Sequence, residues 1–355
     1  MLNVDIGAAC DVPSALYSFS YEPKADWTRI LPSGSELWKY LNDVARKYDL
    51  RPKMSFGMKV ESAEWIEETT RWRIQVRDLK TDRVFAHECQ FLFSAMGLLV
   101  TPRELDVPGA STFQGPIFHS AQWQDVDLTG KRVVVFGNGC TGAQIVPSIV
   151  NQTEHLTQIV RSKHWVFPPI DKRIPKGTQK LLQHVPGLTL ISRIMVFLLA
   201  EKEFQGFYMT SNAAKFRDRR RRQVVKYMRD TAPEKYHDML IPDWEIGCKR
   251  RIFDVGYLES LHAENLTLTD DKAVEILPDG VRLESGAFVP ADVIIHANGF
   301  ETNHYLGNVK IKGRRGITPE EHWESFGGVE AYNCSVMSGF PNFFMLLGKS
   351  PPSTS

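Results

Sequence analysis

The stretch KRVVVFGNGCTGAQIVPSIV, from Lys131 to Val150, decides the fold of this chain. An apolar run, Val133 to Phe136, leads into the loop pattern G-x-G-x-x-G and then into a segment with helical spacing. In such a unit the first glycine makes the tight turn, the second lets a pyrophosphate approach the backbone, and the third allows close helix–strand packing. The stretch therefore predicts a dinucleotide-binding unit with Gly137, Gly139 and Gly142 at the cofactor, and a purely structural turn is the alternative.

The end of the next expected strand bears on the choice of nicotinamide cofactor. An NAD site carries a carboxylate about 20 residues after the loop, where it bonds the ribose hydroxyls. This chain has Arg161, Ser162 and Lys163 there, and a guanidinium pairs well with a 2′-phosphate. We therefore expect NADP rather than NAD, with Arg161 and Ser162 at the phosphate. A simple surface charge at Arg161 is the alternative.

The bulk composition fits an ordinary globular enzyme. The chain has 355 residues, which allows one to three domains, with 43% hydrophobic and 24% charged residues. A formal net charge of +1 argues against a general attraction to nucleic acid or anionic membranes. The five cysteines show no C-x-x-C spacing, so we expect reduced thiols and a cytoplasmic location.

Further elements extend outward from the glycine loop. We expect an amphipathic helix over residues 33–50, capped by Ser35, and a meander of three short strands over residues 53–97. Residues 176–240 are expected to be mainly helical, with their arginine run on a solvated helix face. The last third of the chain returns to short strands.

One apolar stretch in the helical region needs its own explanation. LTLISRIMVFLLA, from Leu188 to Ala200, is shorter than the roughly 20 residues that span a bilayer and contains Arg193. We expect a helix buried in the core, with contact to a membrane surface as the alternative. The start of the chain lacks the basic and apolar regions of a signal peptide, so we expect neither a leader nor an integral membrane segment.

A second motif precedes the glycine loop: FQGPIFHSAQW, over residues 113–123, has the pattern F-x-G-x-x-x-H-x-x-x-W. Together the two motifs resemble the fingerprint of type I Baeyer–Villiger monooxygenases, within the flavin-containing monooxygenases. The resemblance extends over nearly the whole chain. Further similar stretches are GAACDVPSALYSFS (7–20), FSAMG (93–97), IVRSKHWVFPP (159–169), IGCKRRIFDVGYLESL (246–261), IIHANGFET (294–302) and GFPNFFMLLG (339–348).

This resemblance implies an α/β fold with two dinucleotide-binding, Rossmann-like domains and a helical insertion. Relatives carry an earlier G-x-G-x-x-G loop for FAD that is missing from this sequence. We therefore expect a shortened family member whose FAD domain is incomplete and whose FAD binding is weakened. The implied domains are 1–125 with 286–355 for FAD, 126–180 with 241–285 for NADP, and 181–240 for the insertion.

The resemblance also implies a reaction. In the family, NADPH reduces FAD, the reduced flavin activates O2, and one oxygen atom is inserted into a ketone. We therefore expect an FAD- and NADPH-dependent oxidoreductase that acts on a ketone in secondary metabolism. Two alternatives stay open: an NADP-binding relative without redox activity, and a monooxygenase that oxidises nitrogen or sulfur.

Individual residues receive roles from the same resemblance. Arg250 matches the family's catalytic arginine, whose charge would stabilise anionic oxygen, and Asp11 matches the carboxylate that orients it. The alternatives are a turn cap at Asp11 and a solvated basic turn over residues 249–251. Lys249 matches a contact to the NADP 2′-phosphate. The other implied cofactor contacts are Cys10, Tyr17, Val60, Thr141 and Gln144.

The histidine of the first motif, His119, could be a metal ligand, a catalytic base or a buried structural residue. No second histidine, cysteine or carboxylate lies nearby at metal-ligand spacing. In the family this histidine helps to position the linker between the two domains. We expect a buried structural imidazole and no metal.

Overall fold

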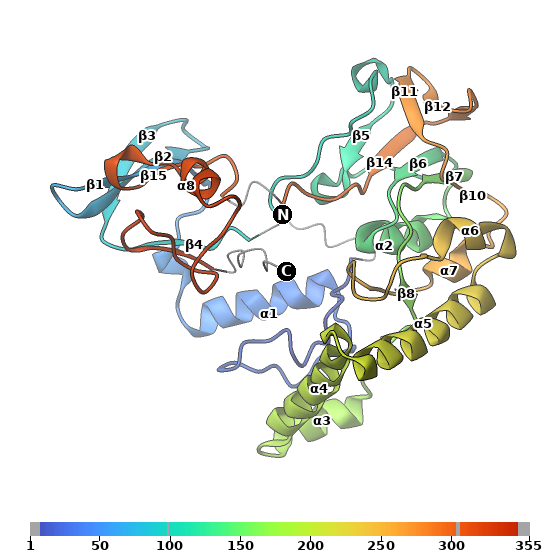
Figure 1. The fold of residues 1–355 in the computed structure, drawn as a ribbon, viewed down its shortest axis with the longest axis horizontal. Helices are drawn as coiled ribbons and strands as arrows, with labels where there is room; N and C mark the ends of the chain where they lie inside the picture. The colour runs from blue at the N-terminus through green and yellow to red at the C-terminus, as the bar shows by residue number, and fades with distance from the viewer. Residues whose placement is uncertain (1–7, 98, 303–305, 347–355) are drawn as a thin grey trace. The chain divides into compact units, whose positions relative to one another are not determined.

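The computed structural model describes residues 8–97, 99–302 and 306–346. The chain divides into two compact units, each with sheets of its own (Figure 1). Unit 1 comprises Met1–Tyr48 and Glu104–Asn298, and unit 2 comprises Asp49–Arg103 and Gly299–Ser355.

Unit 1 is centred on a five-stranded parallel sheet with the order β10-β7-β6-β14-β5. Its central strands are almost wholly buried apolar runs, as parallel strands covered on both faces require. The α/β fold predicted from the sequence is confirmed by this sheet. Its strands are β5 (Ile117–His119), β6 (Arg132–Phe136), β7 (His155–Ile159), β10 (Leu266–Thr269) and β14 (Val293–His296).

The glycine-loop stretch forms the predicted strand, turn and helix. β6 leads into α2 (Cys140–Ile149), and the chain returns through β7, parallel to β6. One side of α2 packs against the sheet in the main core of unit 1. The buried side chains of α2 in this core are Ala143, Ile145, Val146 and Ile149.

Smaller elements surround this sheet. Two short strands, β8 (Val166–Phe167) and β9 (Ile252–Phe253), pair in parallel. Three more form an antiparallel sheet: β11 (Ala273–Leu277), β12 (Gly280–Leu283) and β13 (Phe288–Pro290). The short helices are α6 (His237–Leu240) and α7 (Tyr257–Ser260).

The expected N-terminal helix is α1 (Gly34–Lys47), but its cap is not the predicted residue. Ser33 has an extended backbone, and its hydroxyl accepts the amide N–H of Glu36 at 3.3 Å. Ser35 already lies inside the helix, so the prediction of Ser35 as the cap is wrong. Of the apolar side chains expected to share one face of this helix, Tyr40 and Val44 are buried, whereas Leu41 and Tyr48 are exposed.

The region predicted to be helical contains α3 (Lys176–His184), α4 (Leu188–Phe204) and α5 (Ser211–Thr231), which confirms that prediction. The arginine run lies on α5, where several members form ion pairs with carboxylates of the same unit. These pairs join Arg217 to Glu245, Arg220 to Glu203 and Arg222 to Asp218.

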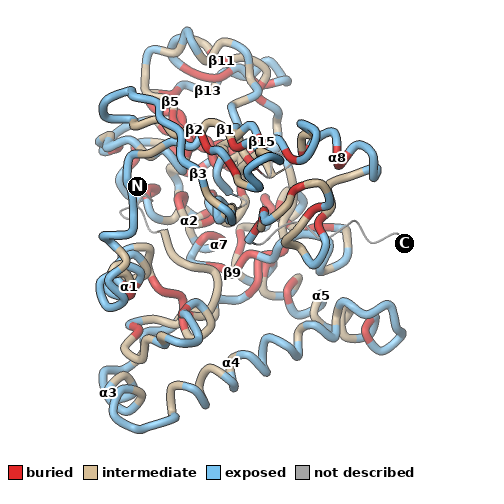
Figure 2. Tube along the Cα trace, turned by 90° about the vertical axis from the view of Figure 1, so that its left-hand side faces the viewer, coloured by how far each residue is buried: buried red, intermediate tan, exposed pale blue. Residues whose placement is uncertain are grey.

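The expectation that Leu188–Ala200 forms a buried core helix is wrong. The stretch is helical, but no residue of α4 is buried, and Figure 2 shows α4 in the colours of intermediate and exposed residues. Apolar side chains occur on all sides of α4, so packing one side against the unit leaves the others exposed. Within the described ranges, no single helix is long and apolar enough to cross a membrane. The pair Lys176–His184 and Leu188–Phe207, bent by 113°, meets that test only jointly.

Unit 2 contains the predicted meander, in which β1, β2 and β3 pair antiparallel and β15 adds in parallel to β1. Its buried core includes Trp65, Trp72 and Phe343. A separate parallel pair is formed by β4 and β16. The elements are β1 (Met58–Ile66), β2 (Arg71–Asp78), β3 (Val84–Cys89), β4 (Leu92–Ser94), β15 (Lys310–Lys312), α8 (Pro319–Ser325) and β16 (Phe343–Met345).

The two units divide the chain at other positions than the predicted domains. β5 and β14 hydrogen-bond in the same sheet as β6, with Val293 opposite Val133. Residues 104–125 and 286–298 therefore belong to unit 1, although the predicted limits assigned them to another domain. The paired strands are far apart in the sequence, so composition along the chain gave no sign of their pairing.

Candidate functional site

The loop between β6 and α2 needs glycine at two of its three motif positions. Gly137 has a φ of +101°, and a Cβ there would approach the carbonyl oxygen of Ala297 to 2.6 Å. A Cβ on Gly142 would approach the carbonyl oxygen of Gly137 to 2.3 Å. Nothing lies within 4 Å of a Cβ built on Gly139, which precedes the first turn of α2. Close backbone contacts thus leave no room for a side chain at Gly137 and Gly142, whereas the space at Gly139 is open. A phosphate could approach the N-terminus of α2 there.

Buried amide side chains fix the backbone of the loop through hydrogen bonds. The side-chain amide of Gln158, a fully buried residue of β7, donates to the carbonyl oxygen of Gly137 at 2.9 Å. Its side-chain oxygen accepts the hydroxyl of Tyr257 at 2.8 Å. Asn138 is also buried and donates to the carbonyl oxygen of Ser162 at 3.0 Å. The loop backbone is therefore fixed to the strand that ends at the predicted phosphate-binding residues.

The same polar network continues to a buried carboxylate that the sequence analysis missed. Asp254 is 2% exposed and accepts the backbone N–H groups of Gly256 at 3.0 Å and Tyr257 at 2.7 Å, at the start of α7. It also accepts the hydroxyl of Tyr227, from α5, at 2.7 Å. Burial and this carboxylate raise the pKa of Tyr227, so the phenol stays protonated and donates. The only sequence signal was Gln158, a polar residue inside an apolar strand.

Asp11 and Arg250 form an ion pair, as the sequence resemblance implied. The guanidinium Nε donates to Oδ2 of Asp11 at 3.0 Å, and one terminal nitrogen donates to the same oxygen. Burial alone would lower the pKa of Arg250, but the hydrogen bonds and charge of Asp11 raise it above its ordinary value. The side chain of Arg250 remains 65% exposed, so Asp11 orients a guanidinium that is still open to a ligand.

The ion pair lies beside the glycine loop. Burial raises the pKa of the Cys140 thiol, and the charges of Asp11 and Arg250 both act on it. Cys140 is the first residue of α2, directly after Gly139. Cys10, whose pKa is likewise raised by burial, lies within reach of the same charges. Both thiols therefore stay protonated near neutral pH.

Gln144, predicted to contact the cofactor, uses its amide within the protein. Its side-chain oxygen accepts the backbone N–H of Ala9 at 3.1 Å, and its nitrogen donates to the carbonyl oxygen of Ala9 at 3.3 Å. This pair of bonds joins the segment of Cys10 and Asp11 to the second turn of α2. Gln144 therefore holds the backbone two residues before Asp11.

The predicted 2′-phosphate residues lie in one region of unit 1. Arg161 is exposed just beyond the end of β7, and Ser162 follows it. Burial lowers the pKa of His164, and the charge of Lys249 lowers it further, so Lys249 lies close to the same segment. The ammonium of Lys249 lies 4.5 Å from the ring centre of Trp244. Two cations are thus available where the sequence predicted a phosphate.

Three other predicted cofactor contacts, Thr141, Tyr17 and Val60, lie on three different segments of the chain. Thr141 is exposed in the first turn of α2, and Tyr17 is exposed on the segment that follows Asp11. Val60 lies on β1 of unit 2, where it pairs with Val76. Their roles as cofactor contacts stay predictions.

His119 is buried, as predicted, at the end of β5. Its Nδ1 accepts the backbone N–H of Ala121 at 3.0 Å, and its ring packs edge-on against His296 at 5.0 Å. Burial lowers the pKa of His296, so this neighbour is held neutral. Among the described residues, no group of three or more histidine, cysteine or carboxylate side chains could hold a metal ion.

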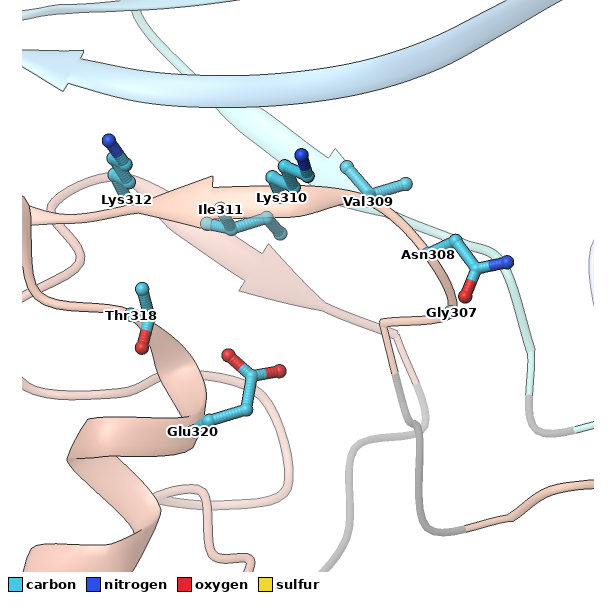
Figure 3. A pocket seen from close by; sticks show the side chains of 8 residues that line it. All are labelled: Gly307, Asn308, Val309, Lys310, Ile311, Lys312, Thr318 and Glu320. Atoms are coloured by element: carbon cyan, nitrogen blue, oxygen red, sulfur yellow. The ribbon is translucent and has the colours of Figure 1, made fainter.

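Unit 2 has a shallow pocket of its own. It has a volume of about 340 Å³ and is lined along β15 and the start of α8, with Lys310, Lys312 and Glu320 around it (Figure 3). None of the predicted site residues lines it. This pocket is therefore not part of the candidate site in unit 1.

Comparisons with known proteins agree with the geometry. A family model described as flavin-binding monooxygenase-like matches residues 15–190. A Baeyer-Villiger monooxygenase of Streptomyces coelicolor is 34% identical over 345 residues, which cover 96% of this chain and 64% of that relative. An uncharacterized monooxygenase of Mycobacterium tuberculosis is 30% identical, with 99% of this chain and 68% of the relative covered. The solved structure of OTEMO in complex with FAD and NADP is 26% identical with a TM-score of 0.81, covering 96% of this chain and 72% of that one. The chain thus spans less than two thirds of the Streptomyces relative.

Proposed function

The chain belongs to the flavin-binding monooxygenase-like family, and from this premise we propose that it is an FAD- and NADPH-dependent monooxygenase that inserts oxygen into a ketone. The observation that carries the proposal is the Asp11–Arg250 ion pair beside the glycine loop. A role in secondary metabolism and a cytoplasmic location belong to the same proposal. The location is supported by five cysteines that are all free thiols.

The residues of unit 1 fit a nicotinamide dinucleotide. The open approach at Gly139 and the N-terminus of α2 suit a pyrophosphate, because backbone N–H groups and the helix dipole favour an anion there. Arg161 and Lys249 provide the positive charge that a 2′-phosphate requires and that NAD does not need.

Arg250 would then act on the charge that develops during oxygen transfer. Bound flavin supplies the activation of O2. A guanidinium held by Asp11 would stabilise negative charge that develops on an oxygen atom beside it, with no reorganisation at the moment of reaction. Asp11 accepts two hydrogen bonds from Arg250 through one oxygen, which fixes the direction in which the guanidinium points.

The experiment is oxygenation with labelled O2. The purified chain is supplied with FAD, NADPH, ¹⁸O2 and a panel of cyclic and linear ketones, together with one sulfide. We expect an ester or lactone that carries one ¹⁸O atom. Arg250→Ala should lose the ester by roughly a hundredfold or more, as removal of a single oxyanion donor does, while some NADPH oxidation continues.

Arg251→Ala is the matched control, because this neighbouring arginine pairs with Glu203 instead of Asp11. It should leave ester formation nearly unchanged. Labelled sulfoxide without any ester would favour oxidation of sulfur or nitrogen. Binding of NADPH with no NADPH oxidation in the presence of FAD would favour an NADP-binding protein without redox activity.

A further inference from the structure

The surface of α3 and α4, over residues 172–204, is both apolar and basic, and we call it the α3–α4 surface. Its apolar side chains lie largely in solvent, although they make up most of α4. Exposed apolar areas of this kind mark interaction sites in folded proteins. The prominent members are Leu190, Ile194, Met195, Phe197, Leu198 and Leu199.

The exposure of α4 is not a consequence of a loosely attached helix. Arg193 donates from one terminal nitrogen to the carbonyl oxygen of Ser18 at 2.8 Å. The hydroxyl of Thr189 donates to the carbonyl oxygen of Leu182 in α3 at 2.8 Å. At the end of α4, Glu203 forms an ion pair with Arg220 of α5. The polar residues of α4 thus attach the helix to the rest of unit 1, and its apolar residues are exposed to solvent.

The charge of this surface is mainly positive. Residues 172–204 contain two acidic residues, Glu201 and Glu203, against six basic residues: Lys172, Arg173, Lys176, Lys180, Arg193 and Lys202. The first four are exposed on and before α3, beside the apolar helix. The chain as a whole has a formal net charge of only +1, so this positive charge is local. A partner for this surface must offer negative charge next to an apolar layer.

We propose that the α3–α4 surface docks on an anionic lipid surface, with α4 lying in the plane of the interface. Helices that bind in this way combine lysine or arginine with large apolar side chains. The apolar side chains of α4 and the basic residues on and before α3 together provide what the boundary between headgroups and acyl chains requires, because the apolar groups enter the acyl layer and the basic groups meet anionic headgroups. A second copy of the chain would bring two surfaces of net positive charge together, which like charges oppose.

Exposed aromatic residues near α4 extend the same argument. Phe19 directly follows Ser18, which accepts the hydrogen bond from Arg193, and its ring is exposed. Tyr21 stacks on Phe19, with ring centres 5.1 Å apart. Aromatic side chains with an apolar body and a polar tip are favoured at the level of the lipid headgroups.

The test is flotation of the full chain with vesicles. Vesicles of phosphatidylcholine with phosphatidylserine should carry the chain upward in a density gradient, and vesicles of phosphatidylcholine alone should carry much less. Added salt should weaken the binding, because the attraction between exposed charges is screened. Lys176→Gln and Lys180→Gln should each lower the affinity by about fivefold, and Lys53→Gln and Lys80→Gln of unit 2 are the controls.

Leu198→Ser tests the apolar part. Leu198 is 60% exposed and Leu79 of unit 2 is 62% exposed, so Leu79→Ser is a closely matched control. Leu198→Ser should weaken vesicle binding by roughly tenfold and Leu79→Ser should not. Both variants should keep the unfolding temperature and NADP⁺ affinity of the parent chain, since neither side chain is buried.

Three results would overturn the proposal. The first is equal flotation with neutral and anionic vesicles, and the second is equal loss for Leu198→Ser and its control. The third is absence of flotation together with a dimer in sedimentation that Leu198→Ser dissolves. That last result would assign the α3–α4 surface to contact between copies of the chain.

Discussion

At the scale of single residues, we expect Arg161 to set the preference for NADPH over NADH. It stands exposed beyond the end of β7, and a charge-assisted hydrogen bond to a phosphate contributes about 1.5–3 kcal/mol. Arg161→Ala should therefore weaken NADPH binding about tenfold or more and leave NADH binding almost unchanged, measured by titration calorimetry. Lys131→Ala, just before β6 and at the opposite end of the parallel strands, is the control. An equal loss for NADPH and NADH would contradict the assignment.

Tyr257 acts on the glycine loop through Gln158. Tyr257→Phe deletes the hydroxyl that donates to Gln158, and a buried acceptor left without a partner costs about 1–3 kcal/mol. Since Gln158 also holds the carbonyl of Gly137, we expect weaker binding of NADP⁺, which carries a pyrophosphate. Binding of adenosine 2′,5′-bisphosphate, which lacks the pyrophosphate bridge, should change little.

Tyr236→Phe provides the comparison for that experiment. Tyr236 is also buried, and its hydroxyl accepts the backbone N–H of Leu268 in β10 at 3.2 Å, away from the loop. Both variants should lower the free energy of unfolding, but only Tyr257→Phe should weaken NADP⁺ binding selectively. Parallel losses in both variants would reduce Tyr257 to a purely structural residue.

At the scale of elements, the sequence predicted those helices and strands that depend on residues close together in the chain. The glycine-loop stretch, the meander and the three helices after residue 176 were visible because each depends on periodicity within a short window. The cap of α1 was misplaced by two residues because Ser33 and Ser35 are both good caps, and only the backbone conformation selects between them. The burial of α4 was predicted wrongly because composition does not reveal which surface a helix meets.

The pairing of β14 with β6 is secured by a charged contact at the start of both strands. Asp292 accepts the backbone N–H of Arg132 at 2.8 Å and pairs with its guanidinium. The hydrogen bonds and charge of Arg132 lower the pKa of Asp292 to about 2. The folded state therefore binds this proton less tightly than the unfolded chain does. The contact stabilises fully above the ordinary value of 3.8, and its contribution is lost as the pH falls towards about 2.

Asp292→Asn should lower the free energy of unfolding by about 1 kcal/mol near neutral pH, since about a third of each side chain is exposed and solvent screens the pair. The difference from the parent chain should shrink as the pH falls from about 4 towards 2. Urea unfolding across this range measures both effects, with Asp125→Asn at an exposed position as control. A difference that stays constant with pH would show that the charge of Asp292 is not the source.

At the scale of the whole molecule, distance along the chain limited what the sequence could predict. Gln158 and Tyr257 are 99 residues apart, and their contact leaves no spacing signal. Asp11 and Arg250 are 239 residues apart, and only the resemblance to a family linked them. The structure contains that contact, while the catalytic role of the pair stays a proposal. The predicted domain limits separated β5 and β14 from β6 for the same reason.

The division into two units has a consequence for stability. Unit 2 builds its core from its own residues, and Trp72 is fully buried in it with its indole N–H donating to the carbonyl oxygen of Pro341 at 2.8 Å. Trp72→Ala should cost about 3–5 kcal/mol, because it removes a large ring and leaves a cavity. The glycine loop, Arg161 and Lys249 all lie in unit 1, so NADP⁺ binding well below the unfolding temperature should persist.

Calorimetric unfolding and NADP⁺ titration of the same samples measure the two effects. Trp38→Ala is the control, since Trp38 of α1 is 59% exposed and its loss leaves no cavity. Trp72→Phe keeps an aromatic ring but loses the N–H donor, so it should fall between the parent and Trp72→Ala. If NADP⁺ affinity fell in step with the unfolding temperature through this series, the dinucleotide site would depend on the core of unit 2, and the assignment of binding to unit 1 alone would be wrong.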